Sequence, residues 1–335
     1  LMQAPENSCP PCGPGPDRRA FLLRAGGCLA QLAFLDAAGV LGRDLFAAER
    51  TRPLIQEVPW GRLERVAEGV WAMVSTPLED RRTLCNGGIV AGSDGVILVE
   101  AFGSPEGATW MAEQARALTG RWPDQVVMTH YHGDHVAGLP GAFFDGETPT
   151  AHATAHTIGR AREQAGAPER AALAAALDRV TVLPPSEETL LDLGGRTLRL
   201  VPRSGHTGSD VTLELDDPSV VFCGDLVWHQ FFPNYMDARP SELSASVTAL
   251  ARDRATTYVP GHGPLADGAA LRSYQQLLGE VEAQARAAHE AGWDAEEAAA
   301  NFRLSGPLQE WFLFSDGYPA RALASWLDEL GGAAP

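Results

Sequence analysis

The chain contains no lysine: all 26 of its basic residues are arginine, against 43 acidic residues and a net charge of −17. An acidic surface of this kind repels phosphate backbones and anionic lipids, and no run of arginines forms a local basic patch. We therefore expect a small-molecule substrate rather than a nucleic-acid partner. Internal repeats and periodic glycine or proline are also absent, which excludes collagen-like and low-complexity chains. Nothing in the sequence specifies an oligomeric state.

Cysteine is scarce as well, with five residues in 335. Cys9, Cys12 and Cys28 all lie within the first 48 residues, so the remainder of the chain has only Cys85 and Cys223. Two cysteines form neither a disulfide framework nor a four-thiolate zinc site. We expect both to be buried free thiols.

The segment 16–42, PDRRAFLLRAGGCLAQLAFLDAAGVLG, resembles a twin-arginine export signal, because Arg18 and Arg19 precede a moderately apolar stretch. Charged residues interrupt that stretch, so we expect no stable membrane anchor. We interpret residues 1–48 as export signal and leader, which predicts a periplasmic or otherwise exported protein. An amphipathic N-terminal helix is the alternative interpretation.

From residue 49 onward, short apolar runs alternate with helical patterns. Strands are predicted within 65–75, 87–101, 124–129, 180–203, 210–225 and 256–260, and helices within 105–120, 155–178 and 241–252. This alternation predicts a layered α/β domain over 49–265, with sheets inside and helices outside. The pattern is helical through most of 266–335, which predicts a C-terminal helical extension.

The segment MTHYHGDHVAG, residues 128–138, concentrates side chains that bind metals. His130 and His132 point the same way if the segment is extended, so both can bind one metal ion. Asp134 and His135 follow Gly133, where the chain can turn sharply, and can face a second ion.

Three more candidate ligands follow predicted strands elsewhere in the chain. They are His206 in SGHTGSD, Asp225 in VFCGD and His262 in YVPGHG, each with a glycine beside it. Glycine lets the backbone approach a site closely, and loops at strand ends carry the chemistry of most α/β proteins. We therefore predict that these three side chains join the residues of 130–135.

These motifs, in this order, resemble those of the metallo-β-lactamase-fold hydrolase superfamily over residues 60–265. The resemblance implies an αββα sandwich, here with the C-terminal helical extension, and two metal ions at the edge between its sheets. It implies a first metal on His130, His132 and His206, a second on Asp134, His135 and His262, and a bridging Asp225. This seven-ligand set is similar to that of glyoxalase II. Two zinc ions are the implied cofactors, with iron or manganese as alternatives.

The implied activity is hydrolysis of a carbonyl ester, thioester or lactone by a metal-bound hydroxide, with Asp134 orienting the hydroxide and moving a proton. Zinc β-lactamases usually carry a cysteine or a non-ligand residue in place of Asp225, and we expect Cys223 to point the other way on its strand. A β-lactamase role is therefore disfavoured, although weak lactam hydrolysis stays open. The acidic tail disfavours a glutathione thioester.

The stretch GDLVWHQFFPNYMD, residues 224–237, is dense in aromatic side chains and follows the predicted bridging aspartate. We predict that it walls the substrate pocket and favours a substrate that is apolar beside its scissile bond. A core role is the alternative. The predicted wall residues are Trp228, His229, Phe231, Phe232 and Tyr235, and the tail segment LQEWFLF is expected to cover the same mouth.

Two other functions remain open at this stage. One is a mononuclear-iron persulfide dioxygenase, which would use His130 and His132 with His206 or Asp225 and leave the second site empty. The other is a non-catalytic metal-binding protein. Metal content separates the dioxygenase, with one iron, from a hydrolase with two zinc ions. An open coordination position on the metals argues against a non-catalytic metal-binding protein.

Overall fold

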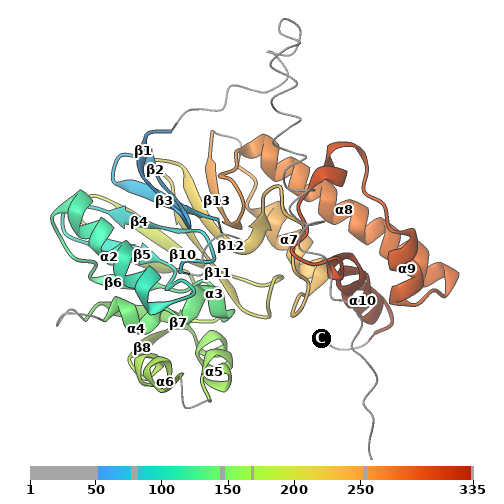
Figure 1. Ribbon diagram of the computed structural model, residues 1–335, viewed down its shortest axis with the longest axis horizontal. Helices are drawn as coiled ribbons and strands as arrows, with labels where there is room; N and C mark the ends of the chain where they lie inside the picture. The colour runs from blue at the N-terminus through green and yellow to red at the C-terminus, as the bar shows by residue number, and fades with distance from the viewer. Residues whose placement is uncertain (1–51, 77–81, 144–147, 167–169, 253–254, 333–335) are drawn as a thin grey trace, which may run out of the picture. The chain divides into compact units, whose positions relative to one another are not determined.

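Figure 1 shows the computed structural model, which describes residues 52–76, 82–143, 148–166, 170–252 and 255–332. The export signal predicted for residues 1–48 lies outside these ranges. Within them, no helix combines the length and the apolar character needed to cross a membrane.

The first sheet has eight strands in chain order, antiparallel from β1 to β5 and parallel from β5 to β8. Its strands are β1 (Leu54–Val58), β2 (Gly61–Ala67), β3 (Val70–Ser75), β4 (Gly87–Ala91), β5 (Val96–Val99), β6 (Gln125–Val127), β7 (Thr150–Thr154) and β8 (Val180–Leu183). The stretch 65–75 was expected to be extended, but it contains a turn, because Gly69 adopts a φ of 67° between β2 and β3.

Helices cover the outer face of this sheet (Figure 1). They are α2 (Pro105–Thr119), α3 (Gly133–Val136), α4 (Leu139–Ala142), α5 (Ala155–Gln164) and α6 (Ala171–Leu177). Helix α2 begins where predicted, since the Ser104 side chain accepts a hydrogen bond from the Gly107 amide, and it ends at Gly120 in the left-handed conformation. The single helix expected over 155–178 is instead two helices, α5 and α6.

The second sheet has five strands in the order β13-β12-β11-β10-β9. They are β9 (Thr189–Asp192), β10 (Thr197–Arg203), β11 (Asp210–Leu215), β12 (Val220–Trp228) and β13 (Thr257–His262). All neighbours are antiparallel except β12 and β13, which are parallel, so both of these strands end at the same edge.

The two sheets pack face to face over an apolar core that includes Val70, Ile97 and Phe222. Helices α7 (Pro240–Ala249), α8 (Gly268–Ala291), α9 (Ala295–Asn301) and α10 (Tyr318–Leu330), with the 3₁₀ helix η3 (Gly306–Glu310), share a further core with β12. The layers are therefore helix, sheet, sheet, helix. This is the predicted αββα sandwich with C-terminal helices.

Candidate functional site

The structure brings the seven predicted ligands together in two adjoining groups. The first group is His130, His132, His206 and Asp225; the second group is Asp134, His135 and His262. The ligand-capable atoms of each group lie within 4.8 Å of one another. They come from the segment after β6, from α3, from the β10–β11 loop, from the interior of β12 and from the last residue of β13 (Figure 1). Asp225 thus lies within a strand, whereas it was expected to follow one.

In the first group, ring nitrogens point at one another. His206 Nε2 lies 2.9 Å from His132 Nδ1 and 3.3 Å from Asp225 Oδ2. His130 Nε2 lies 3.9 Å from the same carboxylate oxygen. Four donors therefore converge on one point, which is the number that a tetrahedral metal site uses.

The second group faces the other oxygen of the same carboxylate. Asp225 Oδ1 lies 3.1 Å from His135 Nε2 and 3.5 Å from His262 Nε2. Asp134 Oδ2 completes this group at 3.2 Å from His262 Nε2 and 3.5 Å from His135 Nε2. One oxygen of Asp225 thus belongs to each group, which is the arrangement that a bridging ligand requires.

The donor atoms fit metal ions better than they fit one another. His130 Nε2, His135 Nε2 and Asp225 Oδ1 are buried and have no hydrogen-bond partner among the described residues. Buried polar atoms without partners are rare and costly, and a cation at each group would satisfy all of them. The residues present therefore fit a dinuclear metal site.

The electrostatics of the first group suit metal binding. Burial lowers the pKa of His130 well below its ordinary value and that of His206 to about 3, so both rings are neutral, as metal ligands must be. Burial alone would raise the pKa of Asp225, but the contacts with His262, His135 and His206 hold it well below its ordinary value. The Asp225 carboxylate is therefore ionised and ready to bind cations.

Two glycines allow close packing at the site, Gly261 against the Asp225 carboxylate and Gly224 against Thr129. A Cβ on Gly261 would collide with Asp225 Oδ1, and a Cβ on Gly224 would lie 2.6 Å from Thr129 Oγ1. Gly224 also adopts a φ of 52°. The glycines in FCGD and PGHG are thus required by close approach of the backbone to the site.

Gly224 also decides where Cys223 points. Residues two apart on a regular strand share a face, so the expectation that Cys223 and Asp225 diverge needs a break in the strand. The positive φ of Gly224 and the register shift between β12 and β13 supply it. The Cys223 thiol is buried among apolar residues and donates to the Val221 carbonyl at 3.6 Å, outside both groups.

Two carboxylates that the sequence did not single out lie beside the histidine rings, and one of them, Asp237, is hydrogen-bonded to its ring. Asp237 Oδ2 lies 2.9 Å from His132 Nε2, and Glu100 Oε1 lies 3.0 Å from His135 Nδ1. Carboxylates in this position fix the tautomer and the orientation of a metal-binding imidazole. The available signal for Glu100 was an acidic residue directly after the apolar strand β5. Asp237 gave no sequence signal, because it depends on a loop conformation.

A cavity of about 730 Å³ opens over the two groups. Its floor includes His132, Asp134, Asp225 and His262, and Asp134 is the most accessible of the three second-group residues, with 27% of its side chain exposed. The remaining lining residues are Leu84, Gly103, Gly133, Ala137, Gln164, Arg170, Trp228, Asn234, Met236, Phe314 and Tyr318. The size is that of a small-molecule site.

Of the five residues predicted to wall this cavity, the structure places only Trp228 in its lining. Phe232 and Tyr235 are almost fully buried in the core under the C-terminal helices. Phe231 packs on Phe312 and Phe314, and His229 Nδ1 lies 3.0 Å from the Pro264 carbonyl oxygen. Phe232 and Tyr235 are therefore core residues, which was the alternative to a role in the pocket wall.

The tail segment LQEWFLF does reach the cavity. Its last residue, Phe314, lines the cavity together with Tyr318 of α10. The ring of Phe314 lies 5.8 Å from those of Trp228 and His262. A short backbone bridge holds the segment there, because the Phe312 amide donates to the Gln230 carbonyl and the Phe232 amide donates to the Phe312 carbonyl.

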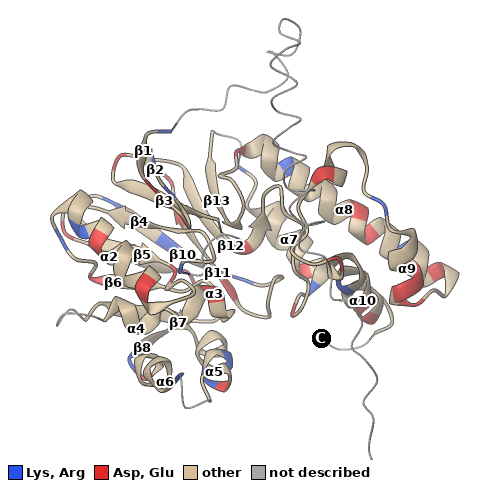
Figure 2. Cartoon of the chain, viewed as in Figure 1, with Lys and Arg blue, Asp and Glu red and all other residues tan. Residues whose placement is uncertain are grey.

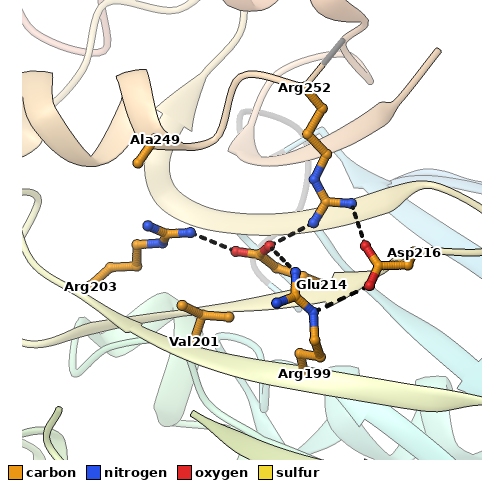
Figure 3. A pocket seen from close by; sticks show the side chains of 7 residues that line it. All are labelled: Arg199, Val201, Arg203, Glu214, Asp216, Ala249 and Arg252. Carbon is orange, nitrogen blue, oxygen red and sulfur yellow. Dashed lines mark hydrogen bonds and ion pairs between the residues drawn. The ribbon is translucent and has the colours of Figure 1, made fainter. Parts of the chain in front are cut away.

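A second hollow, of about 560 Å³, lies on the second sheet and is rich in arginine (Figure 3). Here the buried Glu214 carboxylate binds Arg199, Arg203 and Arg252 at 2.6 to 3.1 Å. Asp216 contacts Arg199 and Arg252 at 3.5 Å. Carboxylates already engage these arginines, so we assign this Glu214 network to stability rather than to anion binding.

Comparison with known sequences agrees with this geometry. The profile described as the metallo-beta-lactamase superfamily matches residues 80–262, which contain all seven clustered residues. A hydroxyacylglutathione hydrolase from Acidiphilium cryptum (strain JF-5) is 31% identical over 163 residues, 48% of this chain and 59% of that protein. A beta-lactamase-like protein 2 homolog from Caenorhabditis elegans is 25% identical over 151 residues, 45% of this chain and 46% of that protein. The matches thus span only part of these relatives.

Solved structures share the fold. A metallo-beta-lactamase from Pontibacter korlensis superposes with a TM-score of 0.54 at 21% identity, covering 64% of this chain and 97% of that one. The metallo-beta-lactamase FIM-1 from Pseudomonas aeruginosa superposes with a TM-score of 0.53 at 21% identity, covering 67% of this chain and 96% of that one. The sandwich, the order of the motifs and the seven clustered side chains lead to one family assignment: the chain belongs to the metallo-beta-lactamase superfamily.

Proposed function

We propose that this protein is a dinuclear metal-dependent hydrolase, with zinc as its metal, that cleaves an acyl ester, thioester or lactone. The observation that carries the proposal is the Asp225 carboxylate, whose Oδ2 faces the first group while Oδ1 faces the second. The similarity to hydroxyacylglutathione hydrolases, whose named substrates are thioesters, supports a thioester among the candidates.

His130, His132 and His206 would hold one metal, Asp134, His135 and His262 the other, and Asp225 both. When bound, the metals would supply Lewis acidity for activating water and polarising the substrate carbonyl. Asp134 is ionised, since His135 and His262 outweigh the effect of burial and lower its pKa to about 2. Its carboxylate lines the cavity, where it can accept a hydrogen bond from the attacking water and orient it.

The reaction forms a C–O bond between water and the acyl carbon and breaks the bond to the leaving sulfur or oxygen. The leaving group takes up one proton from the water, and the acid product loses the other. Trp228, Phe314 and Tyr318 border the site with apolar surface and exclude further water, which strengthens the electrostatic contacts inside.

The alternative functions fit less well. A single-iron dioxygenase would leave the second group unused, although its three residues are buried or half-buried and point at one another. A β-lactamase with cysteine as a ligand is disfavoured, because the Cys223 thiol lies outside both groups. A glutathione thioester is disfavoured by the acidic residues along α8 and α9, where a basic surface would be needed (Figure 2).

The test is metal analysis of the purified protein together with hydrolysis of a panel containing an ester, a thioester, a lactone and a lactam. We expect two zinc ions per chain and turnover that a chelator abolishes and added zinc restores. Asp225→Ala should lose both metals, whereas Cys223→Ala should keep both. One iron per chain with oxygen uptake on a persulfide would overturn the proposal, as would two bound metals without hydrolysis of any panel member.

We also propose export through the twin-arginine pathway, supported by the Arg18-Arg19 pair and the apolar stretch after it. Replacing both arginines by glutamine should leave the protein in the cytoplasm of a bacterial host, whereas the unaltered chain should reach the periplasm. Equal distribution of the two proteins between the compartments would contradict the proposal.

A further inference from the structure

The lining of the cavity over the metal site includes a polar pair and an aromatic group that come from different parts of the fold. Gln164 of α5 and Arg170 beside α6 come from the helix layer on the first sheet. Trp228 comes from β12 of the second sheet, Phe314 from the segment between η3 and α10, and Tyr318 from α10. Figure 1 shows α5 and α6 on one side of the sandwich and α10 on the other. Four of the seven predicted ligands, His132, Asp134, Asp225 and His262, line the same cavity.

Arg170 is the one arginine among the described residues that line the cavity. Its side chain is exposed and donates to the Gln164 carbonyl at 3.3 Å. No carboxylate of the described ranges lies within ion-pair distance of it, although the chain has 43 acidic residues. A guanidinium group in the lining of a cavity attracts an anionic substrate group, and it can hold a carboxylate through two hydrogen bonds.

The aromatic group in the lining, Trp228, Phe314 and Tyr318, is fixed in place by ring contacts. The Trp228 ring packs 4.3 Å from His262 and 5.8 Å from Phe314, and Tyr318 lies 6.5 Å from both Trp228 and Phe314. Arg321 of α10 donates to the Asn234 side chain at 2.7 Å, which ties the helix to the cavity loop. A rigid aromatic surface binds a flat apolar group without a large loss of conformational entropy.

We propose that the enzyme selects substrates with an anionic group on one side of the scissile bond and a flat apolar group on the other. Arg170 binds the anion, and Trp228, Phe314 and Tyr318 bind the apolar group. This inference rests on the proposed hydrolase function. It follows from the composition of the lining, because the metal-capable residues, the Arg170 guanidinium and the aromatic rings all line one cavity, so a substrate whose carbonyl lies at the metal-capable residues can reach both.

The test compares two phenyl thioesters of equal length on the zinc-loaded protein: the glutaryl thioester, which ends in a carboxylate, and its carboxamide analogue. We expect the wild type to prefer the carboxylate in kcat/KM by about tenfold, the lower end for a charged hydrogen bond, because Arg170 is exposed. Arg170→Gln should abolish the preference with unchanged metal content. Arg162→Gln should retain it, because Arg162 pairs with Asp178 outside the cavity lining and controls for net charge.

The aromatic group in the lining is tested with the phenyl and methyl thioesters of glutarate. Phe314→Leu should reduce the preference for phenyl by roughly threefold to tenfold, as expected for the loss of one aromatic contact. Phe302→Leu, which alters the core of the C-terminal helices without lining the cavity, should not. Equal effects of the two substitutions would assign Phe314 to stability alone and overturn its role in selection.

Binding of 5-(phenylthio)pentanoate separates failure of the inference from failure of the proposed function. This thioether cannot be hydrolysed, and calorimetry gives its affinity relative to its carboxamide. A carboxylate preference that disappears in Arg170→Gln supports the inference even if no thioester is turned over. Turnover without any carboxylate preference, or a preference that persists in Arg170→Gln, overturns the inference and leaves the hydrolase assignment intact.

Discussion

Asp237 allows a sharp test of how the metal site is held together. Its Oδ2 lies 2.9 Å from His132 Nε2, so this nitrogen carries the proton and His132 Nδ1 keeps a lone pair for the first metal. The contact with His132 is the first cause that lowers the pKa of Asp237, to about 2, so the carboxylate is ionised. Asp237→Ala removes the group that fixes the His132 tautomer and leaves all seven clustered residues unchanged.

The expected loss is confined to the first metal. Removing a carboxylate that orients a metal-binding histidine weakens affinity roughly 10- to 100-fold. The side chains of Asp237 and His132 are 28% and 15% exposed, so water can replace part of the hydrogen bond. We therefore expect about tenfold weaker binding of the first metal, or about 1.4 kcal/mol. The second metal should bind as before, because its residues make no contact with Asp237 in the described structure.

Competition with a chromophoric chelator measures the two affinities separately. Asp237→Asn, which keeps an acceptor oxygen but not the charge, should lie between the wild type and Asp237→Ala. Asp178→Asn removes a carboxylate that is 72% exposed and distant from the cluster, and should have no effect. Equal weakening of both metals, or unchanged affinity in Asp237→Ala, would refute the assignment of Asp237 to the first metal.

Three further predictions concern stability and close packing. Glu214→Gln should lower the free energy of unfolding by about 2 kcal/mol in urea titrations, because it removes the buried negative charge that the three arginines surround. The Glu188 side chain is 36% exposed, so the control Glu188→Gln should lower that free energy by less than about 0.5 kcal/mol. Burial alone would raise the pKa of Glu214, but its arginine partners lower it. The stability that the ionised Glu214 contributes should therefore be complete above about pH 4.3 and be lost as the pH falls further. An equal dependence of stability on pH in Glu214→Gln would contradict this prediction. Gly261→Ala should abolish binding of both metals by displacing the Asp225 carboxylate, while Gly279→Ala, which has open space in α8, should keep the metals and stabilise the fold by about 0.5–1 kcal/mol. Chelation should lower the melting temperature by at least roughly 5 °C, since ligands that bind only the folded state stabilise it, and an unchanged melting temperature would argue against metals held by the cluster.

The local pattern of the sequence was sufficient for most of the fold. Helix α2 was predictable to within one residue, because Ser104, Pro105 and Gly120 mark its ends through contacts within the helix itself. One local signal was missed. Gly166 and Pro168 lie between α5 and α6, and both residue types disfavour the interior of a helix, so the sequence itself indicates two helices over 155–178 where one was expected.

The aromatic stretch after Asp225 shows what the local pattern could not predict about the cavity. The sequence determined that these residues avoid water, but the C-terminal helices determined which of them became core. They bury Phe232 and Tyr235 and bring Phe314 and Tyr318, distant in sequence, to the cavity instead. Burial of this kind depends on contacts across the whole fold, so the pattern of neighbouring residues does not predict it.

The sequence by itself determined the seven donor residues, because metal chemistry restricts their types and glycine marks the places where the backbone must approach them. The resemblance also implied how those residues divide, and the tertiary structure supplied the distances and orientations behind that division. Strand β12 places the two oxygens of Asp225 between the groups, and the positive φ of Gly224 directs Cys223 away. Only the tertiary structure decided the positions of Asp237, Glu100 and Arg170. The physical reason is that donor identity depends on the side chain alone, whereas distance and orientation depend on segments that meet only when the two sheets pack together.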